Sequence, residues 1–164
     1  MGRSTAWLLA VVVLLAAGVA GVGAYHWSRD SVSRLPQISA YSRGETARVG
    51  PYFFCNVVNL NDCVRDGTQG ALRVDDRDPV QLSVPASIGR APWRLLKVYE
   101  DDRNTTATVF KPGSRLAATI PTLDKQRGRV VGVVVQLLTI VRDQNNAEFE
   151  LPHAEWSVRL NREG

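Results

Sequence analysis

The chain has 164 residues, of which 45% are hydrophobic and 22% are charged. This composition suits one folded domain and gives no indication of disorder or of a repeat array. Lys and Arg total 20 against 16 Asp and Glu, a formal net charge of +4. The small excess is dispersed, and no basic cluster accompanies aromatic residues in a known RNA-binding or DNA-binding pattern. We therefore expect no nucleic-acid partner.

An uncharged, apolar run occupies residues 6–25. As a helix it would be about 30 Å long, the thickness of a bilayer's hydrocarbon core. Trp7 lies at one end, and Tyr25 and Trp27 lie at the other, as in the aromatic belts of membrane proteins. We therefore predict a single transmembrane anchor over residues 1–26 and a linker over residues 27–37.

A cleaved signal peptide is the alternative for this segment. Small residues at positions 22–24 would suit a signal peptidase. Secretory apolar regions usually extend over only about 7–15 residues, however, which favours a retained anchor.

Two cysteines, Cys55 and Cys63, flank a short polar stretch. An isolated, closely spaced pair favours a disulfide, and a disulfide implies an oxidising compartment. The bond would pin the loop over residues 59–61 against its strand. Two unpaired thiols are the alternative, while a metal site is disfavoured because there is no CxxC motif and no nearby His. We therefore place the domain outside the cytoplasmic membrane.

Short segments of alternating or continuous apolar residues follow from residue 38 onward, separated by turn-forming residues. Positions 43–44 indicate a hairpin turn, positions 87–92 another turn, and positions 112–113 and 143–146 two more. The predicted strands cover residues 38–42, 46–49, 52–58, 80–84, 93–100, 105–110, 115–120, 129–141, 148–151 and 156–160.

A series of short strands without an amphipathic helix predicts an all-β fold, a β-sandwich over residues 38–162. The spacing from Leu82 to Trp93 is similar to that of an immunoglobulin-like domain, in which a core Trp follows a core residue of the preceding strand. The two cysteines are too close in sequence for the inter-sheet disulfide of that fold. We expect an immunoglobulin-like β-sandwich and leave its topology open.

Several segments together resemble an uncharacterised actinobacterial family of short, mycobacterial-type envelope proteins. The segments are GPYFFCN at 50–56, NDC at 61–63, and residues 78–85, 88–101 and 152–159. The resemblance covers roughly residues 35–160 and implies an N-terminal apolar segment followed by a domain of unknown function. Since no activity is established for the family, it assigns no catalytic or binding residue.

Candidate chemical groups are few. A Ser or Cys nucleophile needs a base, and the histidines are His26, near the apolar run, and His153, beside a proline. Acidic clusters at residues 75–78 and 100–102 lack the ligand spacing of a calcium loop. We therefore predict a protein that is not an enzyme, with no cofactor and no metal.

The most apolar stretch, residues 129–141, is predicted to form one strand whose side chains alternate between two faces. Val131, Val133, Val135, Leu137 and Thr139 suit the core. The outward face would carry Val134, Leu138 and Ile140, which suggests a partner-docking patch centred on Leu138. Another segment of the chain, such as residues 34–42 or 56–62, could instead cover this face, or a bulge could switch the alternation.

The sequence thus predicts a membrane-anchored, extracytoplasmic module that binds an envelope protein or a cell-wall component. The alternative is a carrier that holds a lipid or small molecule in a cavity between the sheets, which would need at least about 300 Å³.

Overall fold

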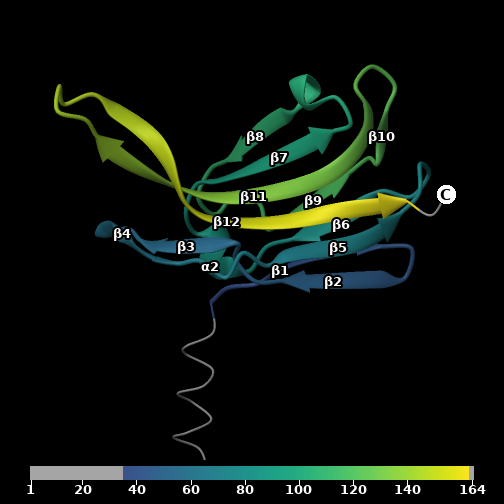
Figure 1. Cartoon of the computed structure of the whole chain (residues 1–164), viewed down its shortest axis with the longest axis horizontal. Helices are drawn as coiled ribbons and strands as arrows, with labels where there is room; N and C mark the ends of the chain where they lie inside the picture. The colour runs from purple at the N-terminus through teal and green to yellow at the C-terminus, as the bar shows by residue number, and fades with distance from the viewer. Residues whose placement is uncertain (1–34, 163–164) are drawn as a thin grey trace, which may run out of the picture. The chain divides into compact units, whose positions relative to one another are not determined.

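The computed structural model describes residues 35–162 (Figure 1). The predicted anchor, with Trp7, Tyr25 and Trp27, lies outside the described residues, as does most of the predicted linker. Within residues 35–162, no helix has the length and apolar character needed to cross a membrane.

The smaller sheet contains four antiparallel strands in the order β2-β1-β6-β9. Its strands are β1 (Ile38–Ser42), β2 (Glu45–Val49), β6 (Val80–Ser83) and β9 (Ala117–Ile120). The predicted hairpin turn at Arg43 and Gly44 joins β1 to β2, and both residues have positive φ angles, 51° and 80°. Such angles match a tight turn to the twist of the strands that it connects.

The larger sheet follows the order β4-β3-β12-β11-β7-β8. Two further strands join it: β5 pairs with β12 in parallel, and β10 pairs with β11. A short helix α2 (Ala86–Gly89) and a 3₁₀ turn η1 (Asp102–Asn104) interrupt the strands. The strands are β3 (Phe53–Asn56), β4 (Asn59–Val64), β5 (Gln69–Val74), β7 (Trp93–Tyr99), β8 (Thr106–Phe110), β10 (Leu123–Asp124), β11 (Gly128–Arg142) and β12 (Glu148–Arg162).

One hydrophobic core joins the two sheets. Leu82 of β6 and Trp93 of β7 are both buried in it, as their spacing predicts, and they lie in opposite sheets. Trp156 of β12 is fully buried, and its indole Nε1 donates a hydrogen bond to the Pro36 carbonyl (2.8 Å). The prediction of an all-β sandwich is therefore confirmed, while an immunoglobulin-like topology stays a prediction.

Three strands, β4, β5 and β10, were not predicted. β5 contributes Leu72 and Val74 to the core and is held by its pairing with β12 and by its contact with β2. A side chain at Gly70 would overlap that of Val49, so only glycine allows this approach. The pairing of β5 depends on a strand distant in sequence, and a local pattern does not contain that information. β4 and β10 instead pair with the adjacent strands β3 and β11. The two predicted strands over residues 148–151 and 156–160 are parts of one strand in the structure, β12.

Candidate functional site

A β-bulge divides the long ribbon formed by β11 and β12. Leu137 pairs with Ala154 while Leu138 pairs with Pro152, so His153 is an extra residue in β12. Both Leu137 and Leu138 are buried, because the bulge switches the alternation of the strand at that point.

The expectation that Leu138 lies at the centre of an exposed patch is therefore wrong. Its exposed fraction is only 3%, and the alternative of a bulge is confirmed. Val134 is half-buried, and Ile140 alone of the proposed patch is strongly exposed, at 64%.

The expected core face is only partly correct. Val133, Val135 and Leu137 are buried, whereas Val131 and Thr139 are half-buried. Val130 lies on the face that the simple alternation of the strand assigns outward, together with Gly132, Val134, Gln136, Leu138 and Ile140. It is nevertheless fully buried, beside a second register shift between β11 and β7.

Beyond the bulge, the β11–β12 ribbon projects past the end of the sandwich (Figure 1). β3 pairs with β12 only at Ala154 and Glu155, and β5 pairs with it from Ser157 onward. Within the described residues, the outer edge of β12 from Glu148 to His153 therefore has no strand paired to it. Its partner on the other edge is β11.

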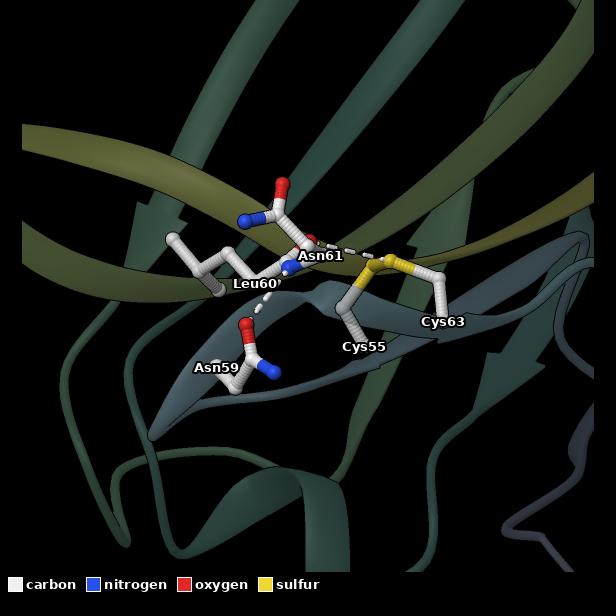
Figure 2. Close-up of a disulfide and its surroundings, with 5 residues drawn as sticks. All are labelled: Cys55, Asn59, Leu60, Asn61 and Cys63. Atoms are coloured by element: carbon white, nitrogen blue, oxygen red, sulfur yellow. Dashed lines mark hydrogen bonds between the residues drawn. A yellow bond between two sulfur atoms is a disulfide. The ribbon is translucent and has the colours of Figure 1, made fainter.

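The predicted disulfide between Cys55 and Cys63 is confirmed (Figure 2). The two residues lie opposite each other in the β3–β4 hairpin, and their α-carbons are 4.0 Å apart. Residues 59–61 are not the predicted loop but the beginning of β4. The bond therefore joins two paired strands just behind the turn at Val57 and Val58.

An apolar groove of about 460 Å³ opens where β3 separates from β12; we call it the wedge groove. The β3–β4 hairpin contributes Tyr52, Phe53, Leu60 and the disulfide, and Gly67 follows the hairpin. The opposite wall is Leu151, Pro152 and His153 of β12. Arg65 is the one formally charged residue along the groove. Its exposed side chain forms no hydrogen bond or ion pair with another residue in the range 35–162.

His153 is buried against the inner part of this groove. Its ring centroid lies 6.1 Å from that of Phe54, in an edge-to-face arrangement. Burial lowers the pKa of His153 below its ordinary value of 6.5, and a backbone hydrogen bond to Leu137 acts more weakly in the opposite direction. The imidazole is therefore neutral at pH 7 and adds no charge to the groove.

The acidic cluster at residues 75–78 is engaged in hydrogen bonds and ion pairs within the domain. Asp75 accepts hydrogen bonds from the backbone amides of Asp78 and Arg77, and these lower its carboxyl pKa. Asp76 contacts Arg162 (2.9 Å) and Arg129 (3.1 Å), and the hydrogen bond from Arg162 is the largest cause of its lowered pKa. Within residues 35–162, no three His, Cys, Asp or Glu side chains are grouped so that they could hold a metal ion.

Two other cavities differ from the wedge groove in their lining. One, of about 430 Å³, is surrounded by Arg43, Glu45 and Arg73. The other, of about 370 Å³, lies between the edge strands of the two sheets and includes Lys97 and Arg115. Both have more polar walls than the wedge groove, which is the apolar binding surface of the three.

Sequence reasoning identified the cysteines but missed the groove around them. Tyr52, Leu60 and Leu151 become neighbours only because β3 and β12 meet and then separate. The one local signal was Pro152, whose missing amide hydrogen marks an interruption of strand pairing.

Comparison with known proteins agrees with the resemblance noted above. Residues 32–161 match the family model described as "Protein of unknown function (DUF2771)". An uncharacterized protein of Mycobacterium bovis, Mb0899c, is 56% identical over 160 residues, covering 98% of this chain and 99% of the relative. The same values hold for Rv0875c, an uncharacterized protein of Mycobacterium tuberculosis. No solved structure matches the chain. The prediction of an uncharacterised mycobacterial-type family is thus confirmed, and this chain belongs to the DUF2771 family of proteins of unknown function.

Proposed function

We propose that this protein is a membrane-anchored, extracytoplasmic binding module of the cell envelope, without enzymatic activity, that holds an amphiphilic molecule in the wedge groove. The anchor is the apolar run over residues 6–25, and the disulfide suits an oxidising compartment. The observation that carries the proposal is the groove itself, whose volume of about 460 Å³ lies in the range of small-molecule sites.

The chemistry of the walls favours an apolar chain that ends in an anion. Leu60 and Leu151 offer aliphatic contacts from opposite sides, and neutral His153 adds no charge. Arg65 supplies a guanidinium without a carboxylate partner among the described residues. A carboxylate or phosphate at the end of the chain could accept two hydrogen bonds from it.

This proposal modifies the idea of a carrier with its ligand between the sheets. Side chains from both sheets, including Leu82 of the smaller sheet and Trp93 and Trp156 of the larger one, fill the core. The wedge groove instead lies outside that core, where filling or emptying it need not disturb the packing between the sheets.

A photoreactive fatty acid tests the proposal. The full chain, reconstituted in lipid nanodiscs, is irradiated with diazirine-labelled dodecanoate, and the adducts are mapped by peptide mass spectrometry. We expect adducts in residues 52–67 and 151–153, and none around the polar cavity at Arg43 and Arg73. Adducts confined to residues 6–25 would refute the proposal.

Matched substitutions sharpen this test. Leu151→Arg should abolish labelling of residues 52–67, because it places a charge in the apolar wall. Leu123→Arg should leave the labelling unchanged, since Leu123 is a similarly exposed leucine on β10 that does not line the groove.

A second candidate is the binding of an envelope protein by strand addition. The observation that favours it is the unpaired outer edge of β12 from Glu148 to His153, which could pair with an extended peptide. Pro152 has no amide hydrogen to offer such a strand, which makes this the weaker candidate.

A further inference from the structure

We propose that the tip of the β3–β4 hairpin is a membrane-contacting loop that inserts into the apolar surface of a lipid bilayer. The inference rests on the proposed membrane anchor. It assigns a lipid surface as the partner of the exposed tip residues Val57 and Val58.

The tip is unusually apolar for an exposed turn. Val58 is 91% exposed and Val57 is 56% exposed, and residues 51–61 contain no charged side chain. Valines at such exposure contribute nothing to the core, so only a partner outside the domain could bury them.

The backbone of the tip is also prepared for a water-poor environment. The Asn56 Oδ1 accepts a hydrogen bond from the Val58 amide (2.9 Å), and the Asn59 Oδ1 accepts one from the Asn61 amide (3.2 Å; Figure 2). Unpaired amides are costly in lipid, and these two are satisfied by side chains of the tip itself. The disulfide closes the hairpin behind the tip and limits the conformational entropy that insertion would cost.

Exposed apolar side chains are concentrated on the tip and on the elements near it. Seven of the eleven large hydrophobic side chains that are exposed within residues 35–162 lie on or beside the β3–β4 hairpin and the projecting β11–β12 ribbon. They are Tyr52, Val57, Val58, Val64, Ile140, Phe149 and Leu151. Tyr52 is suited to the boundary of the bilayer, where an aromatic ring can be half-buried while its hydroxyl stays in water.

The tether brings this surface within reach of a membrane. Ten residues, 26–35, separate the end of the apolar run from Pro36, and a fully extended chain of that length reaches at most about 36 Å. Pro36 is held by Trp156, whose ring packs edge-to-face on Phe54 of β3. The chain therefore enters the domain beside the hairpin, and a short tether makes weak contacts effective by raising the local lipid concentration.

The charges near the tip have mixed signs. Asp62, Arg65 and Asp66 follow one another at the base of the hairpin, so there is no cationic patch to attract anionic lipid. Insertion should accordingly depend on apolar contact and be insensitive to lipid charge and to salt.

The test places an environment-sensitive fluorophore at the tip of the full chain. The Val58→Cys variant is labelled with the fluorophore. Its fluorescence is then measured in vesicles of phosphatidylcholine alone and in vesicles that also contain phosphatidylglycerol. Val109→Cys, an exposed valine on the edge strand β8, is the matched control. We expect a blue shift and loss of iodide quenching at position 58 in both vesicles, with quenching by spin-labelled lipid, and no change at position 109.

Several outcomes would overturn the inference. The first is a label at position 58 that stays as accessible to iodide as the label at position 109. The second is a blue shift seen only with anionic lipid, and the third is protection from iodide that increases with protein concentration at fixed lipid. Because the new cysteine could disturb the native disulfide, benzoylphenylalanine at position 58 provides a second measurement, with lipid adducts expected and their absence contradictory. If the proposed anchor is wrong, the full chain will be lost from floated vesicles. If only the insertion of the tip is wrong, the chain will stay bound to the vesicles while the label at position 58 remains in water.

Discussion

The inner and outer parts of the β11–β12 ribbon have the same antiparallel pairing but different surroundings. The inner part, residues 130–137 and 154–160, supplies Val133, Trp156 and other fully buried side chains to the core. The outer part, residues 139–142 and 148–151, carries Ile140 and Phe149 in exposed positions. Apolar side chains therefore contribute to the core in one part of the ribbon and are exposed in the other.

The bulge at His153 is the physical boundary between the two parts. It reverses which side chains point inward and bends the strand, and the wedge groove opens beside it. The following substitutions compare the two parts, from the largest expected effect to the smallest.

Trp156→Ala should cost about 4 kcal/mol of the free energy of unfolding, because it empties a fully buried site and removes the hydrogen bond to Pro36. Phe149→Ala on the outer part should cost less than about 1 kcal/mol, since that ring is half-exposed. Urea unfolding followed by tryptophan fluorescence measures both. Equal losses would show that the outer part is as important to the fold as the core.

Leu138→Glu should lower the free energy of unfolding by about 3 kcal/mol or more, because it buries a carboxylate without a partner. Ile140→Glu, two residues away but beyond the bulge, should change it by less than about 0.5 kcal/mol. Thermal unfolding of the two variants compares them. A stable Leu138→Glu variant would contradict the burial of Leu138.

Replacing both cysteines, Cys55→Ala with Cys63→Ala, should release the β3–β4 hairpin at a cost of about 2.5 kcal/mol in the chain-entropy description of a short loop. The effect should be local, because Cys55 lies outside the main core cluster. Hydrogen exchange should accelerate in residues 53–64 and stay unchanged in β1 and β2. Uniform acceleration would mean that the hairpin unfolds only together with the core.

The smallest expected effect is a pH dependence from His153. Its pKa is lowered in the folded state, so the unfolded chain binds the proton more tightly, and stability falls as the pH drops below 6.5. Thermal unfolding between about pH 7.5 and about pH 5 should show this loss, and His153→Phe should reduce it. The carboxyl pKa values of Asp75 and Asp76 are lowered below their ordinary value of 3.8, so their protonation changes stability outside this pH range. If His153→Phe left the pH dependence of thermal stability unchanged, the attribution of this dependence to His153 would be contradicted.

The sequence by itself determined the all-β class, the turn at Arg43 and Gly44, the disulfide and the family. Each depends on local information: alternation of period two, glycine in a positive-φ position, or two cysteines close along the chain. The burial of Leu82 and Trp93 in successive strands also followed from spacing alone, whereas their placement in opposite sheets came from the structure.

Only the tertiary structure decided where the candidate site lies. The bulge that buries Leu138 depends on the register between β11 and β12, and a shift of one residue exchanges the two faces of a strand. The wedge groove exists because β3 leaves β12 after two paired residues, which no segment of either strand specifies alone. Register and strand order arise from contacts between distant residues, so the exposed apolar surface could be located only after the strands were paired.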